Sequence, residues 1–370
     1  MNNSASTKAT VNIYTKLNTY DSYQVIALPV TYAGVSESFA GSGVYTYVWN
    51  EGDGWERRGY YDDLSAFEAI GLVQNASHTY TISGTLASTE DFSETLAYTT
   101  GTYQGTNVYG NSWTAPIKIS EISIPAAYAE QTVYVLENGS WHGYELGGAK
   151  DADVVPAMQA FAIKATASGG SVSIDYDDAV RGNADYRTEA LRAPQRTTIA
   201  KDYMALAITD GDRQTRLRLR EDARFTEEFD NGWEATYLEG DGLSGQLFVQ
   251  KDDKMVVLAE PDLEGTVVGL IPGVATDYTI SFEGNGDGYY LNDLVTEQST
   301  LIAEGNTYMF TADANTNATR FVISRTPIRN MPTGVDVIND GTKARKQLIN
   351  GVLYIIRDGR LYNATGAKVK

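Results

Sequence analysis

The sequence predicts an all-β fold: two antiparallel β-sandwich domains of the Ig-like or jelly-roll-like kind, followed by a short three-stranded C-terminal β-meander tail. Three observations predict it. Apolar and polar residues alternate with a period of two along most of the 370 residues, whereas sustained helical periodicity is nearly absent. Glycine-containing turn sequences separate these short segments. At about 100–200 residues per domain, the length corresponds to two domains.

The first sandwich domain is predicted over residues 1–185. Residues 51–54, which read EGDG, predict a hairpin between the aromatic segments on either side, and Asn138-Gly139 predicts a two-residue hairpin turn. A further turn is expected at Gly169-Gly170. The strand-like segments of this domain are 23–30, 44–50, 55–61, 78–86, 132–146 and 160–178.

A polar segment without alternation, which contains Pro194, predicts a linker over 186–198 and a second sandwich domain over 199–328. In TRLRLRE (215–221), Leu217 and Leu219 share one face of a strand and the arginines share the other, which indicates a half-buried strand. The strand-like segments of this domain are 203–209, 215–221, 245–250, 255–260, 266–272, 277–284, 308–312 and 320–324.

The last segment, 329–370, is predicted to be a loop and a basic tail. Asn350-Gly351 and Asp358-Gly359 are hairpin-turn sequences on either side of 352–357, so a three-stranded meander of about 25 residues is expected. Residues 341–370 hold seven Lys or Arg and one Asp, a charge of +6, which leaves −25 for residues 1–340. Strands this short cannot build a core, so the tail must dock or stay mobile. A segment recognised for targeting and a solvated C-terminus are both consistent with this positive charge.

Composition excludes several function classes. The chain has 29 Lys or Arg and 48 Asp or Glu, a net charge of −19, which argues against nucleic acid or an anionic membrane as a partner. No apolar run approaches 18 residues, so we expect no membrane insertion. Cysteine is absent, and the only histidines are His78 and His142, far apart in sequence. No pair of carboxylates stands out as a glycosidase dyad. We therefore expect no enzyme activity and no cofactor.

Two side-chain patterns leave a site open. The Gly-rich acidic run 283–288 resembles a calcium loop, but position twelve is Leu294, so a hairpin turn fits better; the Asp-rich segments 175–178 and 210–212 are also expected to be turns. Aromatic side chains on a predicted hairpin could instead stack on a sugar, although aromatic residues on strands more often pack against one another. The candidate glycan contacts are Trp49, Trp55 and Tyr60.

The tail KQLINGVLYIIRDGRLYNATGAKVK resembles the C-terminal segment of secreted and cell-surface proteins of the Bacteroidales, and is similar to a type IX-like C-terminal sorting tail. It is shorter than the usual Ig-like sorting domain of that secretion system. The matching positions are Lys346, Leu348, Gly351, Leu353, Ile355, Arg357, Gly359, Tyr362, Gly366, Val369 and Lys370.

The rest of the chain resembles segments of the same proteins. Residues 225–323 are similar to the β domain that often precedes such tails: FTEEFDNGWEATYLEG resembles its start, with Glu234 where the family usually has Asp. YYLNDL (289–294), YMFTA (308–312) and RFVIS (320–324) resemble its end. Residues 107–163 are similar to an upstream segment, with Ser112-Trp113 in NVYGNSWTAPIKI where Pro-aromatic is usual.

This resemblance implies a non-enzymatic C-terminal stalk and secretion or sorting region of a larger secreted or surface-anchored protein. The expected partner is the outer-membrane secretion and sorting machinery, with Arg345, Lys346, Arg357 and Arg360 as candidate contacts. The alternative is an adhesin or carbohydrate-binding module that takes a glycan or a host surface as its partner. We expect an extracellular or outer-surface location on a Gram-negative bacterium. MNNSASTKATVNIY lacks the apolar segment of a signal peptide, so the chain is either cytoplasmic or a fragment whose upstream part has been removed. The composition, with 25 tyrosines, 35 glycines and no cysteine, favours the second interpretation.

Overall fold

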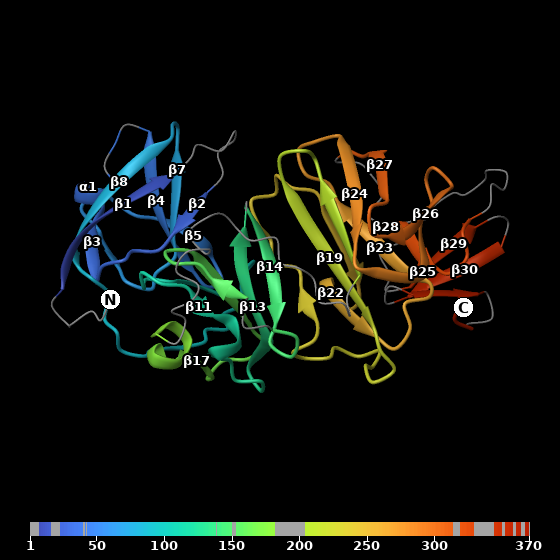
Figure 1. The fold of residues 1–370 in the computed structure, drawn as a ribbon, viewed down its shortest axis with the longest axis horizontal. Coiled ribbons are helices and arrows are strands. Elements are labelled where there is room, and N and C mark those ends of the chain that lie inside the picture. Colours follow the sequence, from blue (N-terminus) through green and yellow to red (C-terminus); the bar gives the residue numbers. More distant parts are fainter. Residues whose placement is uncertain are drawn as a thin grey trace. The chain divides into compact units, whose positions relative to one another are not determined.

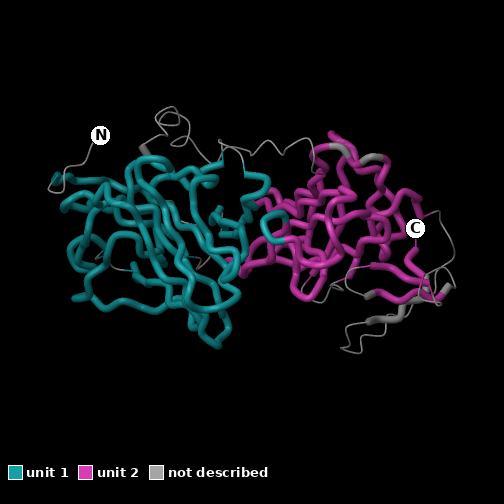
Figure 2. The backbone as a smooth tube through the Cα atoms, turned by 90° about the horizontal axis from the view of Figure 1, so that it is seen from below, with its two compact units in different colours: residues 1–197, 231–233 teal, residues 198–230, 234–370 magenta. Residues whose placement is uncertain are grey.

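The computed structural model describes residues 7–15, 23–39, 41, 43–137, 139–149, 153–181, 204–313, 319–328, 344–349, 352–357, 360–363 and 367–369. These residues form an almost entirely β structure, as the sequence predicts (Figure 1). The chain divides into two compact units, coloured separately in Figure 2: residues 1–197 with 231–233, and residues 198–230 with 234–370. The predicted linker, 186–198, lies outside the described residues.

The N-terminal half of unit 1 packs three small sheets around one hydrophobic cluster, which includes Leu28, Leu64, Ile70 and Leu72. The predicted hairpin at 51–54 is present, because β4 and β5 pair there and Gly52 and Gly54 adopt positive φ. The elements of this half are β1 (Lys8–Thr15), β2 (Gln24–Ile26), β3 (Tyr32–Gly34), α1 (Val35–Ser38), β4 (Val44–Asn50), β5 (Gly54–Arg57), β6 (Asp63–Ser65), β7 (Ile70–Gln74) and β8 (His78–Thr85).

The C-terminal half of unit 1 surrounds a second cluster, which includes Trp113, Ile117, Val133 and Ile163. Its four-stranded sheet has the order β10-β16-β13-β14, and β12-β17-β9 form a three-stranded sheet. The elements are β9 (Phe92–Thr95), β10 (Thr106–Gly110), β11 (Ile117–Lys118), η1 (Ile119–Glu121), β12 (Ile122–Ser123), β13 (Ala129–Glu137), β14 (Ser140–Glu145), β15 (Val154–Val155), β16 (Ala160–Ala165), β17 (Ser171–Ile174) and η2 (Asp177–Arg181).

Two turns in this half have different outcomes. β13 and β14 form the hairpin predicted at 138–139, and Gly139 has a φ of 84°. At Gly169-Gly170 the chain also turns, but β16 and β17 belong to different sheets, so this turn is a corner between sheets and not a hairpin.

Unit 2 is built on one 14-stranded sheet whose main path runs β26-β25-β28-β23-β21-β22-β19-β18-β24-β27. Strands from both ends of this path contribute to a single hydrophobic core, with Ile302 from β26 and Phe310 from β27. The sheet therefore folds over on itself as a sandwich does. The elements before the tail are β18 (Met204–Thr209), β19 (Gln214–Glu221), β20 (Ala235–Thr236), β21 (Gln246–Gln250), β22 (Lys254–Glu260), β23 (Thr266–Ile271), β24 (Asp277–Glu283), β25 (Asn285–Asp293), β26 (Gln298–Ala303), β27 (Thr307–Thr311) and β28 (Thr319–Ser324).

The alternation predicted for TRLRLRE is confirmed in β19: Leu217 and Leu219 are fully buried and the arginines are half-buried. The expectation that every strand pair is antiparallel is wrong at this place, because β19 and β22 run parallel, with Arg218 opposite Val257. Between these two strands the chain makes β20 and β21, and this long connection gives it room to return in the same direction.

Candidate functional site: the C-terminal meander and its anchorage

The tail forms the three-stranded antiparallel meander that the sequence predicts. β29 (Ala344–Ile349) pairs with β30 (Val352–Arg357) along its full length, and β30 pairs with β31 (Arg360–Asn363). The predicted turns at 350–351 and 358–359 lie outside the described residues. β31 also lies beside β23: Thr266 is opposite Arg360, and the backbone N–H of Leu361 donates to the carbonyl oxygen of Gly265 at 3.1 Å. The tail is therefore joined to the sheet of unit 2.

An apolar contact holds the meander in place. Ile356 and Leu361 are both buried and pack against Val267 of β23 and Val322 of β28. Three half-buried side chains surround this contact: Leu294, Tyr354 and Val369. Complete burial of an aliphatic side chain of this size stabilises a fold by about 1.5–3 kcal/mol, so the two residues together provide a substantial part of the docking free energy.

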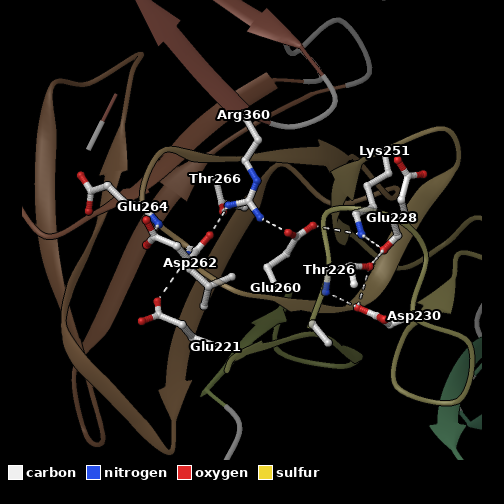
Figure 3. A network of polar contacts seen from close by, with 12 residues as sticks. Glu221, Thr226, Glu228, Asp230, Lys251, Glu260, Asp262, Glu264, Thr266 and Arg360 are labelled. Atoms are coloured by element: carbon white, nitrogen blue, oxygen red, sulfur yellow. Dashed lines mark hydrogen bonds and ion pairs between the residues drawn. The ribbon is translucent and has the colours of Figure 1, made fainter. Parts of the chain in front are cut away.

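Arg360 anchors the tail by charge (Figure 3). Its side chain is only 5% exposed, and its guanidinium forms an ion pair with Glu260. The same guanidinium donates to the backbone carbonyl oxygen of Asp262 and, at 3.0 Å, to the hydroxyl of Thr266. The sequence-based expectation that Arg360 contacts an external partner is corrected here, because the folded chain itself buries and pairs this charge.

The ion pair belongs to a buried set of four charges. Lys251 places its Nζ 3.0 Å from Glu260 Oε1 and 2.9 Å from Glu234 Oε1. Glu234 is completely buried, and it also accepts the backbone N–H groups of Ala259 and Asp230, each at 3.0 Å. Two carboxylates thus meet two cations. An unpaired buried charge is strongly destabilising. The tail therefore stabilises unit 2, because its Arg360 supplies one of these four charges.

A second acidic group lies beside the first. Glu221, Asp262 and Glu264 gather around Tyr289 and Arg325: Arg325 forms an ion pair with Glu221 at 2.8 Å, and the Tyr289 hydroxyl donates to Glu221 and Asp262. Burial alone would raise the pKa of Asp262, but the N–H of Glu264, the Tyr289 hydroxyl and the positive charge of Lys368 together lower it. Lys368 of the tail therefore also favours the ionised form of Asp262.

These carboxyl groups predict a pH dependence. Burial raises the pKa of Glu234 despite the nearby Lys251, and burial also raises the pKa of Glu264, helped by the charges of Asp262 and Glu221. A carboxyl group whose pKa is higher in the folded state opposes folding while it is ionised, and this cost disappears as the pH falls through the folded pKa. Calorimetric melting should therefore give a higher Tm for unit 2 at pH 5 than at pH 8.

A matched variant and a lower pH range test the same prediction further. Glu264→Gln keeps an acceptor for the backbone N–H of Arg325 but cannot titrate, so it should reduce the difference in Tm. Below about pH 4 the trend should reverse, because the lowered pKa of Asp262 gives a stabilisation that is lost when this group is protonated. An equal or lower Tm at pH 5 would contradict the prediction.

The motifs that resemble the Bacteroidales β domain come together inside unit 2. Arg320 of RFVIS is 3% exposed and donates from Nε and Nη2 to Asp293 Oδ2 of YYLNDL, at 3.0 and 2.7 Å. Tyr308 of YMFTA donates its hydroxyl to the same oxygen at 2.6 Å. The three motifs thus build one buried polar cluster, and this geometry gives them a structural role.

The upstream motif has a similar role in unit 1. Asn111 is completely buried and its Nδ2 donates to three backbone carbonyl oxygens, those of Ala115, Val155 and Pro156, at 3.0–3.1 Å. Trp113 is 2% exposed and donates its indole N–H to the carbonyl oxygen of Ser88 at 2.8 Å. These side chains close the turn after β10 and fill the second core.

The sorting-tail residues fall into three groups. Val369 packs in the docking contact, Leu353 is 36% exposed, and Ile355 and Tyr362 are half-buried. Lys346, Leu348 and Arg357 lie in β29 and β30, of which the structure describes the backbone at these positions. Gly351, Gly359, Gly366 and Lys370 lie outside the described residues.

The candidate glycan residues do not form one platform. Trp49 and Trp55 are half-buried and meet edge to face, with ring centroids 5.2 Å apart, and Trp49 also donates its indole N–H to Thr106 O at 2.7 Å. Tyr23 stacks on Trp55 at 5.0 Å, which uses one face of that indole. β5 ends at Arg57, so Tyr60 lies in the following turn, 58% exposed and in contact with Tyr61.

The acidic segments have different outcomes. Asp210 Oδ1 accepts the backbone N–H groups of Asp212 and Arg213, so 210–212 forms the expected turn. Asp175 Oδ1 accepts those of Asp177 and Asp178, but this segment leads into the helical element η2 and is not a plain turn.

The hairpin turn expected at 283–288 is wrong, because this run joins β24 to β25, which pair with other strands and not with each other. In the described part of the chain, no three or more acidic or histidine side chains are grouped as metal ligands would be. No helix in that part has the length and apolar character needed to cross a bilayer.

Sequence reasoning missed Lys251, Glu260 and Thr266 as partners of the tail. No local signal could identify them, because Arg360 follows Thr266 by 94 positions. In the sequence, Glu234 is marked only by its departure from the family pattern.

Comparison with known proteins gives one informative likeness. The chain is 26% identical over 348 residues to the minor fimbrium subunit Mfa5 of Porphyromonas gingivalis, a match that covers 82% of this chain and 28% of that protein. The chain thus spans under a third of the length of the curated relative that it matches. No protein-family model matches the chain, and no solved structure matches it significantly.

Proposed function

We propose that this chain is a non-enzymatic β module of a cell-surface protein associated with fimbriae, from a bacterium of the Bacteroidales. The similarity to a fimbrium subunit of Porphyromonas gingivalis supports the surface location and a structural or adhesive role. The acidic, all-β composition of the chain agrees with such a role. The cores of both units consist of packed apolar residues, and unit 2 also holds buried ion pairs, which suits a stalk.

Within this role, the C-terminal meander is the proposed address for the outer-membrane sorting machinery. The observation that carries this proposal is the resemblance of the tail to a type IX-like sorting segment, together with its position as a small basic meander docked on an acidic domain. A tail of this length has no core of its own, and its anchorage gives it a defined folded form that a receptor can recognise.

Deletion of residues 344–370 tests the proposal that the meander is the address for the sorting machinery. In the native host, the deleted protein should lose most of its surface-exposed fraction, measured as the ratio of surface to total protein with antibodies against unit 1. Tyr308→Phe is the matched control, because it weakens the buried cluster of unit 2 moderately and leaves the tail and its anchorage intact. An unchanged ratio after deletion, or an equal loss in the control, would make the address proposal wrong.

An adhesive role is the second candidate, and the exposed turn after β5 favours it. Tyr60 and Tyr61 are 58% and 91% exposed and hold each other edge to face at 5.0 Å. Such exposed aromatic side chains suit contact with a glycan or a host surface. Trp49 and Trp55 contribute less to this candidate, because their rings pack against other aromatic rings of unit 1.

A further inference from the structure

Strand β27 lies at one end of the main sheet path of unit 2, beside β24 (Figure 1). Among the described strands it pairs with β24 alone. Tyr308 and Phe310 are buried in the core, whereas the other side chains of the strand are exposed, and Met309 is 77% exposed. β27 is therefore an edge strand with one solvent-facing side and one unpaired backbone edge.

The hydrogen-bond ladder shows which backbone groups point to this free edge. The N–H of Ala312 donates to the carbonyl oxygen of Thr276 at 2.8 Å, so this pair, next to the pair of Asp277 and Thr311, is hydrogen-bonded. Hydrogen-bonded and non-hydrogen-bonded pairs alternate along an antiparallel ladder, and residues of the second kind point their N–H and C=O groups away from the partner strand. The residues of β27 that present these groups to the free edge are therefore Thr307, Met309 and Thr311.

β27 lacks the features that usually keep an edge strand from pairing. It contains no charged residue and no proline, whereas charged residues stand in other edge strands: Lys8 in β1, Glu56 in β5 and Glu94 in β9. β26, at the other end of the same path, is uncharged as well, but its Ser299 accepts the backbone N–H of Ile328 at 2.8 Å. The edge of β27 is therefore the one that is open to another strand.

The five residues of β27, Thr-Tyr-Met-Phe-Thr, are nearly self-complementary. Antiparallel pairing of two copies centred on Met309 places Met309 opposite Met309, and Thr307 opposite Thr311 of the other copy. Each N–H at the free edge then meets a carbonyl oxygen of the other copy. The carbonyl oxygen of Thr311 also accepts from Arg320 at 2.7 Å, and its second lone pair stays available. Apolar side chains lie opposite apolar ones and hydroxyls opposite hydroxyls, which stabilises a sheet.

We propose that two copies of this chain associate edge to edge through β27, in antiparallel orientation about a two-fold axis at Met309, so that their sheets continue across the contact. The inference goes beyond the proposed function and does not depend on the tail. Another extended chain could meet the same backbone groups, but a second copy also brings matching side chains and adds no charge at the edge, although each chain has a net charge of −19.

The size of this contact determines where it forms. Two paired five-residue strands bury less area than a stable protein interface, which needs about 1,200 Å². The association is therefore weak in dilute solution and is favoured where copies are concentrated, as on a cell surface.

Cysteine substitutions test the register, because the chain contains no cysteine. After oxidation with copper phenanthroline, Met309→Cys should give a disulfide-linked dimer, since directly opposite residues of a hydrogen-bonded pair have Cα atoms about 5.5 Å apart, as disulfides require. Thr307→Cys should not, since it lies about 13 Å along the strand from its equivalent in the other copy. Val295→Cys, at a position that is 62% exposed and outside β27, measures cross-linking by random collision.

Sedimentation velocity measures the association without a cross-link. The average mass of the parent should rise with concentration, and Met309→Lys should abolish this rise while the Tm stays unchanged, because it places like charges opposite each other at an exposed position. Val295→Lys is the matched control and should associate as the parent does.

Equal cross-linking of the three cysteine variants, or a parent whose mass does not rise with concentration, would overturn the proposal. Cross-linking of Met309→Cys to a different protein on native cells, without any dimer, would show that the edge pairs with another chain and would overturn the choice of a second copy.

Discussion

Arg360→Ala is expected to destabilise unit 2 by about 3–5 kcal/mol, the range for removing one partner of a buried ion pair. The guanidinium is the tail's contribution to the four buried charges, and its loss leaves Glu260 to share Lys251 with the completely buried Glu234. Thr266 and the carbonyl oxygen of Asp262 lose a donor at the same time. We expect the meander to undock before the remainder of the sheet opens.

Hydrogen exchange of the full chain measures this loss of stability in unit 2. Four of the five tryptophans, at positions 49, 55, 113 and 141, lie in residues 1–197 of unit 1, so the fluorescence follows mainly that unit and serves as an internal reference. Protection of amides in β22, β23 and β30 should fall, while the fluorescence transition stays unchanged. Arg224→Ala is the control, since this arginine pairs with Asp222 at an exposed position and should have little effect.

A double variant identifies the cause. Arg360→Met with Glu260→Leu removes one positive and one negative charge, and leaves Lys251 paired with Glu234. Apolar replacements of a buried ion pair are often neutral, so this variant should recover much of the lost stability. A double variant as unstable as Arg360→Ala would show that shape, and not charge balance, determines the anchorage.

Arg320→Ala is the second change with a large expected effect, about 3–5 kcal/mol on unit 2 for the same physical reason. Arg320 donates twice to Asp293 and once to the carbonyl oxygen of Thr311 at 2.7 Å, and its guanidinium lies 4.4 Å from the ring centroid of Phe310. Without it, the carboxylate of Asp293 is buried with no cation among the groups that contact it in the described structure.

Two milder variants calibrate this result by the same exchange experiment. Tyr308→Phe removes a single hydrogen bond to a charged group and should cost about 1.5–3 kcal/mol. Arg320→Lys keeps the charge but loses the planar set of donors, so an intermediate effect is expected. If Arg320→Ala costs no more than Tyr308→Phe, the ion pair is not the main determinant of this cluster.

The sequence was informative wherever the determinant was local. Alternation predicted the buried face of β19, and Asn138-Gly139 predicted the hairpin of β13 and β14, because period-two patterning and positive φ at glycine are properties of adjacent residues. The meander followed from two short turn sequences in the same way. These features need no knowledge of the rest of the chain.

Long-range features could not be predicted in this way. The parallel pair of β19 and β22 depends on where β20 and β21 lie, which no period in the sequence encodes. A basic tail is equally consistent with solvated arginines and with buried ones. Arg360 is nevertheless buried, because it pairs with Glu260 and Thr266, which lie nearly a hundred residues earlier in the sequence. Similarly, the motif at 289–294 resembled a family without revealing that Asp293 pairs with Arg320.

The anchorage of β31 on β23 also has a consequence in time. Every strand of unit 2 that the tail touches is synthesised before the tail, and Arg360 must return across 98 positions to reach Asp262. Closing so long a loop costs entropy before any contact compensates for it, and non-local pairing of this kind slows folding. Unit 2 therefore completes its buried set of four charges only after β31 has been synthesised. Until then these buried charges are unbalanced, which favours an incompletely folded chain.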